Sequence, residues 1–146
     1  MTGSAEMKLV FRLAEVGFSL PVNLLVEIVE LEKAPRVSRR KDAPPWPEVD
    51  YRDEKIPVVD IAKAFGLDKN AGSALTMLVL HGELGRWGTL AHEIEGIRPA
   101  SEFEERGLSP LFSLAGETLY DKIDIWRSEP LIQLEPERFA PQGESP

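Results

Sequence analysis

The sequence predicts a mainly β protein in which two small β units follow one another within a single domain of 146 residues. Short apolar segments recur at spacings of roughly 8–12 residues, which is typical of barrels or sandwiches. Glycine, proline and acidic residues separate these segments, as turns require. A weak internal repeat, short enough to arise by chance, also suggests two similar β units in tandem. Its first copy comprises Leu9–Phe11, Gly17 and Glu27–Glu30, and its second comprises Leu78–Leu80, Gly85–Gly88 and Glu93–Glu95.

The composition narrows the class of protein. The chain holds 17 basic and 25 acidic residues, for a formal net charge of −8. A protein that binds nucleic acid through its phosphates is normally basic, so we expect no nucleic-acid partner. The absence of cysteine removes disulfides and thiolate metal sites. Lys8 and Arg12 interrupt the first apolar run, so we expect neither a signal peptide nor a membrane span, and a cytoplasmic protein.

The first half is expected to consist of strands joined by turns. Leu9, Phe11 and Leu13 share one face of the first strand and Lys8 and Arg12 share the other, which is the period of a half-buried strand. The expected elements are a strand over Met7–Ala14, a turn at Glu15–Gly17, a strand over Phe18–Leu20, a turn at Pro21–Leu24, a strand to Leu31, a loop over Glu32–Pro47, strands over Glu48–Arg52 and Lys55–Val59, and a helix over Ile61–Phe65 capped by Asp60.

The second half is expected to repeat this organisation after a polar link at Asp68–Ser73. The segment Leu75–Leu80 is apolar apart from Thr76, as in a buried strand. The expected elements are strands over Leu75–Leu80, Arg86–His92 and Glu93–Pro99, an acidic loop over Ala100–Gly116, a hairpin formed by Thr118–Trp126 and Leu131–Leu134, and a helical turn at Glu137–Phe139. Residues 1–6 and 140–146 are expected to fray.

The loop Glu32–Pro47 is the basic part of the chain. It contains four prolines, and four cations cluster between Arg36 and Lys41. Long loops without regular structure are often functional. Arg39 and Arg40 are therefore candidate docking residues for an acidic protein partner, and the alternative is an ordinary solvated loop.

The sequence carries no recognisable catalytic pattern. It lacks a Gly-x-Ser-x-Gly elbow and a phosphate-binding glycine loop. Its only histidines, His81 and His92, are far apart in the sequence, and a metal site would need more ligands at closer spacing. We expect no enzyme, cofactor or metal. A small metal-binding β-barrel enzyme that uses both histidines and Glu93 is the remote alternative.

One strand carries an unusual combination of residues. Pro57 lies inside the apolar run Ile56–Val59, and proline within such a run belongs at a sheet edge or a strand start. A sheet edge is exposed backbone that something must cover. Arg52, just before this run, can present its planar guanidinium to a carboxylate or to backbone carbonyls, or it can be an ordinary turn residue.

Four motifs in order resemble the CheW-like family of bacterial chemotaxis coupling proteins. The hallmark of that family reads roughly Asn-x-Arg-Gly, two residues, then Ile-Pro-Val-x-Asp-Leu. The matching segments are Asp50–Ile61, Phe18–Ile28, Ala91–Ile97 and Gln133–Phe139, and the similarity covers about Met7–Phe139. At three family positions this chain differs, with Asp50 for asparagine, Asp53 for glycine and His92 for aspartate.

The resemblance implies a fold of two five-stranded SH3-like β-barrels around a shared core, with short helices. The domain would span residues 7–139, with a first barrel at about 7–67, a second at about 74–135 and a chain crossover between them. It also implies a non-enzymatic scaffold without cofactor that links methyl-accepting receptor tips to the regulatory domain of a histidine kinase. The protein would then meet the membrane only indirectly, through receptor arrays.

The candidate partner-binding residues follow from the hallmark and from the strand that precedes it. They are Arg52, Asp53, Leu25, Glu27 and Ile28, together with Arg39 and Arg40 of the basic loop. Since aspartate tolerates special backbone angles less well than glycine, Asp53 motivates an alternative. In that alternative the fold is kept but the module docks a different signalling or localisation partner.

Overall fold

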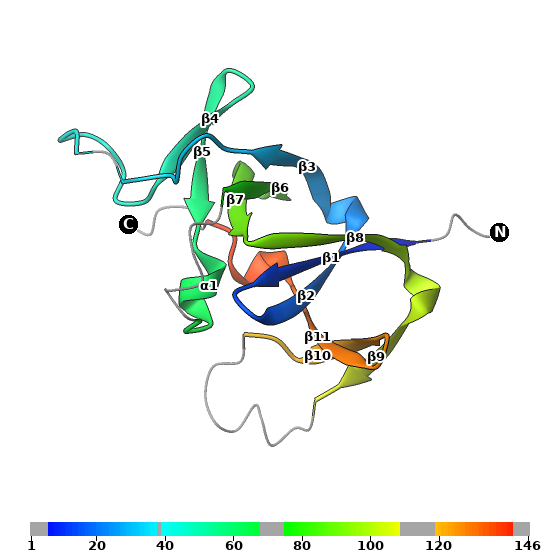
Figure 1. The fold of residues 1–146 in the computed structure, drawn as a ribbon. Coiled ribbons are helices and arrows are strands. Elements are labelled where there is room, and N and C mark those ends of the chain that lie inside the picture. Colours follow the sequence, from blue (N-terminus) through cyan, green and yellow to red (C-terminus); the bar gives the residue numbers. More distant parts are fainter. Residues whose placement is uncertain (1–5, 38, 68–74, 109–118, 142–146) are drawn as a thin grey trace.

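The computed structural model describes residues 6–37, 39–67, 75–108 and 119–141. They form two curled sheets that pack against each other (Figure 1). One sheet contains β1 (Met7–Leu13), β2 (Val16–Pro21), β8 (Glu93–Pro99), β9 (Phe103–Gly107), β10 (Lys122–Trp126) and β11 (Glu129–Gln133). The other contains β3 (Leu25–Glu30), β4 (Glu48–Tyr51), β5 (Glu54–Val59), β6 (Thr76–Gly82) and β7 (Gly85–Ala91). The predicted mainly β fold of two small units is confirmed.

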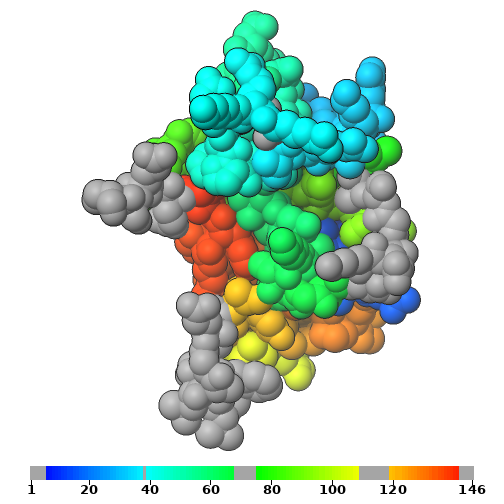
Figure 2. All heavy atoms as spheres, turned by 90° about the vertical axis from the view of Figure 1, so that its left-hand side faces the viewer, coloured from blue at the N-terminus to red at the C-terminus, as the bar shows by residue number. Residues whose placement is uncertain are grey.

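Within the described residues, four short helical segments connect the strands. They are the 3₁₀ turns η1 (Val22–Leu24), η3 (Ala100–Glu102) and η5 (Pro136–Arg138), and the helix α1 (Ile61–Ala64). Asp60 caps α1 as expected, since its side chain accepts a hydrogen bond from the Lys63 amide at 3.0 Å. The basic loop between β3 and β4 lies beside the β4–β5 hairpin at one end of the molecule (cyan in Figures 1 and 2).

The first sheet has six strands rather than five because β9 forms where a loop was expected. Within Ala100–Gly116, residues Phe103–Gly107 pair antiparallel with β10. Phe103 packs against Trp126, with ring centroids 6.0 Å apart, and the other residues of β9 are exposed. A strand that buries one side chain shows no period-2 alternation, so sequence periodicity misses it. Residues 109–116 of the expected loop and the link at 68–73 lie outside the described residues.

The two sheets share one topology and exchange a strand. Their strand orders are β8-β1-β2-β11-β10-β9 and β3-β6-β7-β5-β4. Each contains one parallel pair, β2 with β11 and β5 with β7. The repeat β1-β2-β3 therefore matches β6-β7-β8, but β3 pairs with β6 and β8 pairs with β1.

Because of this exchange, each sheet contains strands from before and after the link between residues 67 and 75. Each barrel draws strands from both halves. Pro21 ends the β2 ladder and η1 then redirects the chain into the other sheet. Local apolar period identifies which face of a strand is buried, but it carries no information about which distant strand pairs with it.

The shared core lies between the sheets. Leu9, Phe11 and Leu13 of β1 pack there with Phe18 and Leu20 of β2. These five side chains are at most 1% exposed. Strands of the second sheet complete the cluster with Leu78, Leu80, Trp87 and Ala91. Because both sheets contribute, this core joins the two barrels into one packed unit.

The opposite face of β1 is also enclosed. A half-buried strand was expected here, but β1 is covered on both sides. Val10 is fully buried inside the six-stranded barrel. Its neighbours Lys8 and Arg12 reach acidic partners, Lys8 contacting Asp124 and Arg12 contacting Glu129. The two cations that suggested a solvated face instead bind carboxylates of the same barrel.

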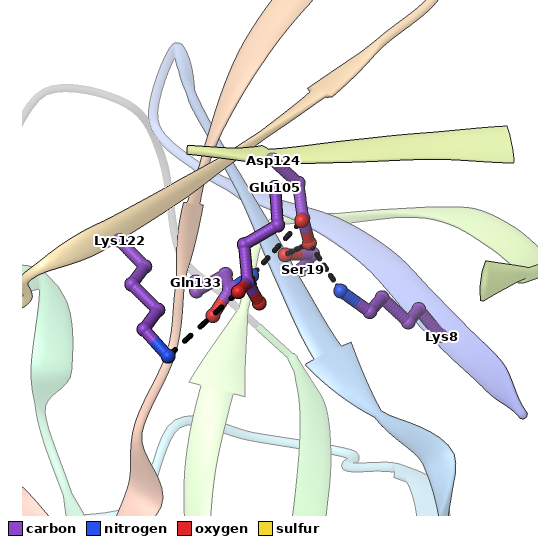
Figure 3. A network of polar contacts seen from close by, with 6 residues as sticks. All are labelled: Lys8, Ser19, Glu105, Lys122, Asp124 and Gln133. Carbon is purple, nitrogen blue, oxygen red and sulfur yellow. Dashed lines mark hydrogen bonds and ion pairs between the residues drawn. The ribbon is translucent and has the colours of Figure 1, made fainter. Parts of the chain in front are cut away.

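Asp124 is the centre of a buried polar network (Figure 3). Its side chain is 0% exposed and accepts hydrogen bonds from Lys8 at 2.7 Å, Ser19 at 2.7 Å and Gln133 at 2.9 Å. Burial raises the pKa of Asp124, but the three hydrogen bonds outweigh it, and the pKa lies below its ordinary value. The network therefore holds an ionised aspartate among four strands.

Candidate functional site

The candidate site is built on the hairpin that joins β4 to β5. Its two turn residues, Arg52 and Asp53, have φ values of 47° and 64°. Two successive residues in the left-handed region are the mark of the type I′ turn that closes two-residue hairpins. Asp53 stands where the family pattern has glycine, and aspartate is among the few other residues that enter this region readily. The turn thus keeps its geometry despite the substitution.

Pro57 fits this hairpin because β5 is paired on one side at a time. Residues Glu54–Pro57 pair with β4, while the parallel pairing with β7 involves Val58 and Val59. The Val58 amide donates to the Pro47 carbonyl at 2.9 Å on the β4 side. Since amide directions alternate along a strand, the Pro57 nitrogen points away from β4. On that side the pairing with β7 begins only at Val58. The proline thus costs no ladder hydrogen bond, although β5 is not the edge strand.

The hairpin tip binds Glu27 of β3. The Arg52 Nη2 atom lies 2.9 Å from Glu27 Oε1, and Arg52 Nε donates to the Tyr51 hydroxyl at 3.0 Å. The Tyr51 hydroxyl in turn donates to Glu27 Oε1 at 2.6 Å. Strands β3 and β4 are the two edges of the five-stranded sheet, so these contacts also close the sheet into a barrel.

The Glu27–Tyr51–Arg52 cluster combines a fixed geometry with exposure. Tyr51 is buried, whereas the side chains of Arg52 and Glu27 are 65% and 39% exposed. The guanidinium carbon of Arg52 lies 5.5 Å from the Tyr51 ring centroid, and that of Arg86 lies 5.7 Å from it. A buried aromatic ring thereby holds an exposed cation in place.

The cluster also keeps its charges. The hydrogen bond from Tyr51 and that from Arg52 lower the pKa of Glu27 below its ordinary value. The hydrogen bond to Glu27, together with that to Tyr51, raises the pKa of Arg52. Both groups therefore stay ionised throughout the neutral range.

Other acids near the tip have separate roles. Asp50 binds Lys55 across the hairpin at 3.0 Å, and Asp53 is exposed in the turn. The acid that engages Arg52 is therefore Glu27 of β3, at the opposite edge of the sheet, and not an acid adjacent in sequence.

The remaining candidate residues do not join the cluster. Leu25 and Ile28 are half-buried and pack against the shared core, because a bulge between Leu25 and Glu27 shifts the register of β3. Arg39 and Arg40 are exposed in the basic loop, where Arg40 lies 4.0 Å from Asp42. The structure thus brings Glu27, Arg52 and Asp53 to one end of the barrel.

Sequence reasoning missed Tyr51 and Arg86 as parts of this site. Tyr51 directly precedes Arg52 in the hallmark segment, and a tyrosine beside an arginine is a signal that was available. Arg86 lies on β7, and its approach to Tyr51 depends on the pairing of β5 with both β7 and β4. No local pattern could have indicated that approach.

The hairpin between β10 and β11 repeats the arrangement on the other barrel. Its turn residues Arg127 and Ser128 have φ values of 51° and 66°. The Arg127 guanidinium carbon lies 4.3 Å from the Trp126 ring centroid. The Trp126 indole donates to Glu102 at 3.1 Å, and Arg98 forms an ion pair with the same carboxylate. An aromatic residue, a turn arginine and a carboxylate therefore recur together.

We expect Glu102 to stabilise the fold in a pH-dependent manner. The hydrogen bond from Arg98, then that from Trp126, lowers the pKa of Glu102 from 4.5 to about 2. Because the folded pKa lies below the unfolded value, the stabilisation is complete above about pH 4.5 and is lost as the pH falls toward 2. Thermal unfolding from pH 6 to pH 2 measures it. The difference in melting temperature between the wild type and Glu102→Gln should shrink on acidification, and a constant difference would contradict the assignment.

The histidines occupy structural positions. His92 accepts a hydrogen bond at Nδ1 from the Ala14 amide at 3.0 Å, and His81 is exposed near the end of β6. Across residues 6–37, 39–67, 75–108 and 119–141, no group of three or more His, Asp or Glu side chains is arranged to hold a metal ion. In the same part of the chain, no helix has the length and apolar character needed to cross a bilayer.

Comparison with known proteins identifies the relatives of this chain. The crystal structure of the scaffolding protein TtCheW from Thermoanaerobacter tengcongensis superposes with a TM-score of 0.68 at 19% identity, covering 92% of this chain and 91% of that chain. This likeness shows the fold. No protein with a curated description matches by sequence. The sequence model of one family, described as CheW-like domain, matches residues 8–121. The chain therefore belongs to the CheW-like domain family.

Proposed function

We propose that this protein is a non-enzymatic scaffold in chemotaxis-type signalling that links receptors to a histidine kinase through protein–protein contacts. Membership of the CheW-like family supports the scaffold class. The partners in this proposal are the regulatory domain of the kinase and the cytoplasmic tips of methyl-accepting receptors. The protein would act in the cytoplasm beside receptor arrays.

The observation that carries the proposal is the exposed arginine held at the β4–β5 tip. Arg52 occupies the hallmark position, and Tyr51 and Glu27 fix two of its nitrogen atoms. A guanidinium has five N–H donors, so the remaining donors can bind a carboxylate or backbone carbonyl of a partner. Because the side chain is already oriented, little conformational entropy is lost on binding.

Removal of the Arg52 side chain should weaken partner binding. We expect Arg52→Ala to reduce affinity for at least one of the two partners tenfold or more, which corresponds to about 1.4 kcal/mol. Calorimetric titration of the full chain with a purified kinase regulatory domain and with a receptor tip measures this change. Lys55→Ala is the matched control, since Lys55 is an exposed cation on the same hairpin. A folded wild type that binds neither partner would refute the proposal.

A second candidate keeps the scaffold role but changes the partner. Asp53 favours it, because a carboxylate projects from the tip where the family pattern has glycine. Glycine adopts the φ of 64° without strain, so Asp53→Gly preserves the turn and removes only the carboxylate. In the same titrations, a kinase or receptor affinity that emerges only in Asp53→Gly would favour this second candidate. Equal affinities in both forms would show that Asp53 does not select the partner.

A further inference from the structure

An apolar groove opens beside the β4–β5 hairpin and shares Arg86 with the site described above. It has a volume of about 450 Å³. Trp46 at the end of the basic loop, Pro57 of β5 and Leu84 of the β6–β7 turn form its walls, together with Trp87 and Pro141. In Figure 2 the cyan basic loop lies above the red C-terminal segment.

Two large apolar side chains of the groove are exposed to solvent. Trp46 is 42% exposed and Leu84 is 65% exposed. Leu84 lies in a tight turn beside Glu83, a position at which turn geometry favours small or polar residues. Exposed apolar residues that converge on a concave surface are characteristic of protein interaction sites.

Among the described residues that line the groove, Arg86 is the one that carries a charge. Its guanidinium faces the Tyr51 ring, and none of the ion pairs among the described residues involves it. The charge of Arg86 also acts on Glu27, but no carboxylate of the described residues lies within ion-pair distance of it. An apolar group that carries a carboxylate is therefore complementary to this wall. One arginine is too little positive charge for a polyphosphate or nucleic acid on a chain of net charge −8.

We propose that this groove binds a protein segment that presents a large apolar side chain next to an aspartate or glutamate. The apolar side chain contacts Trp46 and Leu84, and the carboxylate binds Arg86. Tyr51 lies against both Arg86 and Arg52, so a partner seated in the groove extends directly onto the hairpin tip. This inference rests on the proposed scaffold function and specifies the chemistry of the partner segment.

The test measures the affinity of full-length variants for the kinase regulatory domain and the receptor tip. We expect Leu84→Ser to weaken binding of one partner tenfold or more. Arg86→Gln should weaken the same interaction severalfold and reduce its dependence on salt. Val37→Ser is the matched control, because Val37 is 48% exposed in the basic loop and does not line the groove. Arg106→Gln is the charge control, on exposed β9 of the other barrel. Melting temperatures establish that each variant folds.

Fluorescence gives a direct readout of occupancy. The chain has three tryptophans, of which Trp87 and Trp126 are buried. Emission that is accessible to a soluble quencher therefore arises mainly from Trp46. Partner binding should protect it in the wild type and in Val37→Ser, and should protect it less in Leu84→Ser at the same partner concentration.

The outcomes separate this inference from the proposed function. A wild type that binds neither partner refutes both. A wild type that binds, with Leu84→Ser and Arg86→Gln equal to it, refutes the groove alone. Self-association of the free wild type that Leu84→Ser abolishes would assign the groove to a second copy and overturn the proposal. Trp46 quenching that rises on removal of residues 142–146, without a change in partner affinity, would assign the groove to the end of this chain. That result would also overturn the proposal.

Discussion

Replacement of Asp124 by alanine should lower the free energy of unfolding by about 3–5 kcal/mol, the usual cost of removing one member of a buried ion pair. The reason is local to the six-stranded barrel. Lys8 would keep its charge without a counter-ion, and Ser19 and Gln133 would lose their shared acceptor. Urea unfolding at pH 7, followed by the fluorescence of the neighbouring Trp126, measures the change.

A double-mutant cycle separates the ion pair from the rest of the network. Lys8→Met removes the cation and keeps most of the apolar stem, and we expect the double variant with Asp124→Ala to be more stable than the sum of the single losses predicts. Because the pKa of Asp124 lies below its ordinary value of 3.8 in the folded state, its contribution is complete above that pH and declines on acidification. Additive losses would show that Lys8 and Asp124 do not stabilise each other.

Phe18→Ala should destabilise the protein by a similar amount, about 3–5 kcal/mol. Phe18 is fully buried in the shared core. It stacks on Phe11 with a centroid distance of 5.4 Å and meets the edge of Phe65 at 5.2 Å. The cavity left by alanine would lie between the two barrels, so both should unfold together at a lower urea concentration.

The control for this prediction is Phe18→Leu, which keeps most of the apolar volume and should cost much less. Two probes distinguish cooperative from separate unfolding, since circular dichroism reports the strands and tryptophan fluorescence reports the core, to which Trp87 belongs. Transitions that no longer coincide in Phe18→Ala would contradict a single core that unites the barrels.

The strands were predictable where one face is apolar and the other polar. The Glu93–Pro99 strand was predicted with its observed bounds. The turn expected at Asp53-Glu54 lies one residue earlier, at Arg52-Asp53, between the two expected strands. The Phe103–Gly107 strand was not predicted, because one aromatic contact is all that its sequence contributes to the core beside β10. A chain crossover between the barrels was expected only through the family resemblance, because pairing over a long sequence separation leaves no trace in the local apolar period.

The site was predictable only in part, for a related reason. Arg52 and Glu27 were both candidates, and the structure joins them. The third member, Tyr51, becomes relevant once closure brings β4 to β3. Leu25 and Ile28 were candidates because they lie with Glu27 on a strand expected to border the same surface. A bulge in β3 packs both of them, half-buried, against the core. Such an irregularity follows from long-range packing, not from spacing.

The strand exchange between the repeats has a consequence for how such a molecule can arise. A polypeptide with one repeat would hold a hairpin and a third strand that cannot complete its own barrel, since β3 pairs with β6 and β8 pairs with β1. Two identical copies could satisfy each other by reciprocal donation, as in domain-swapped dimers. Gene fusion would then convert that homodimer into a monomer with internal pseudo-symmetry, and its halves would be free to diverge toward different partners.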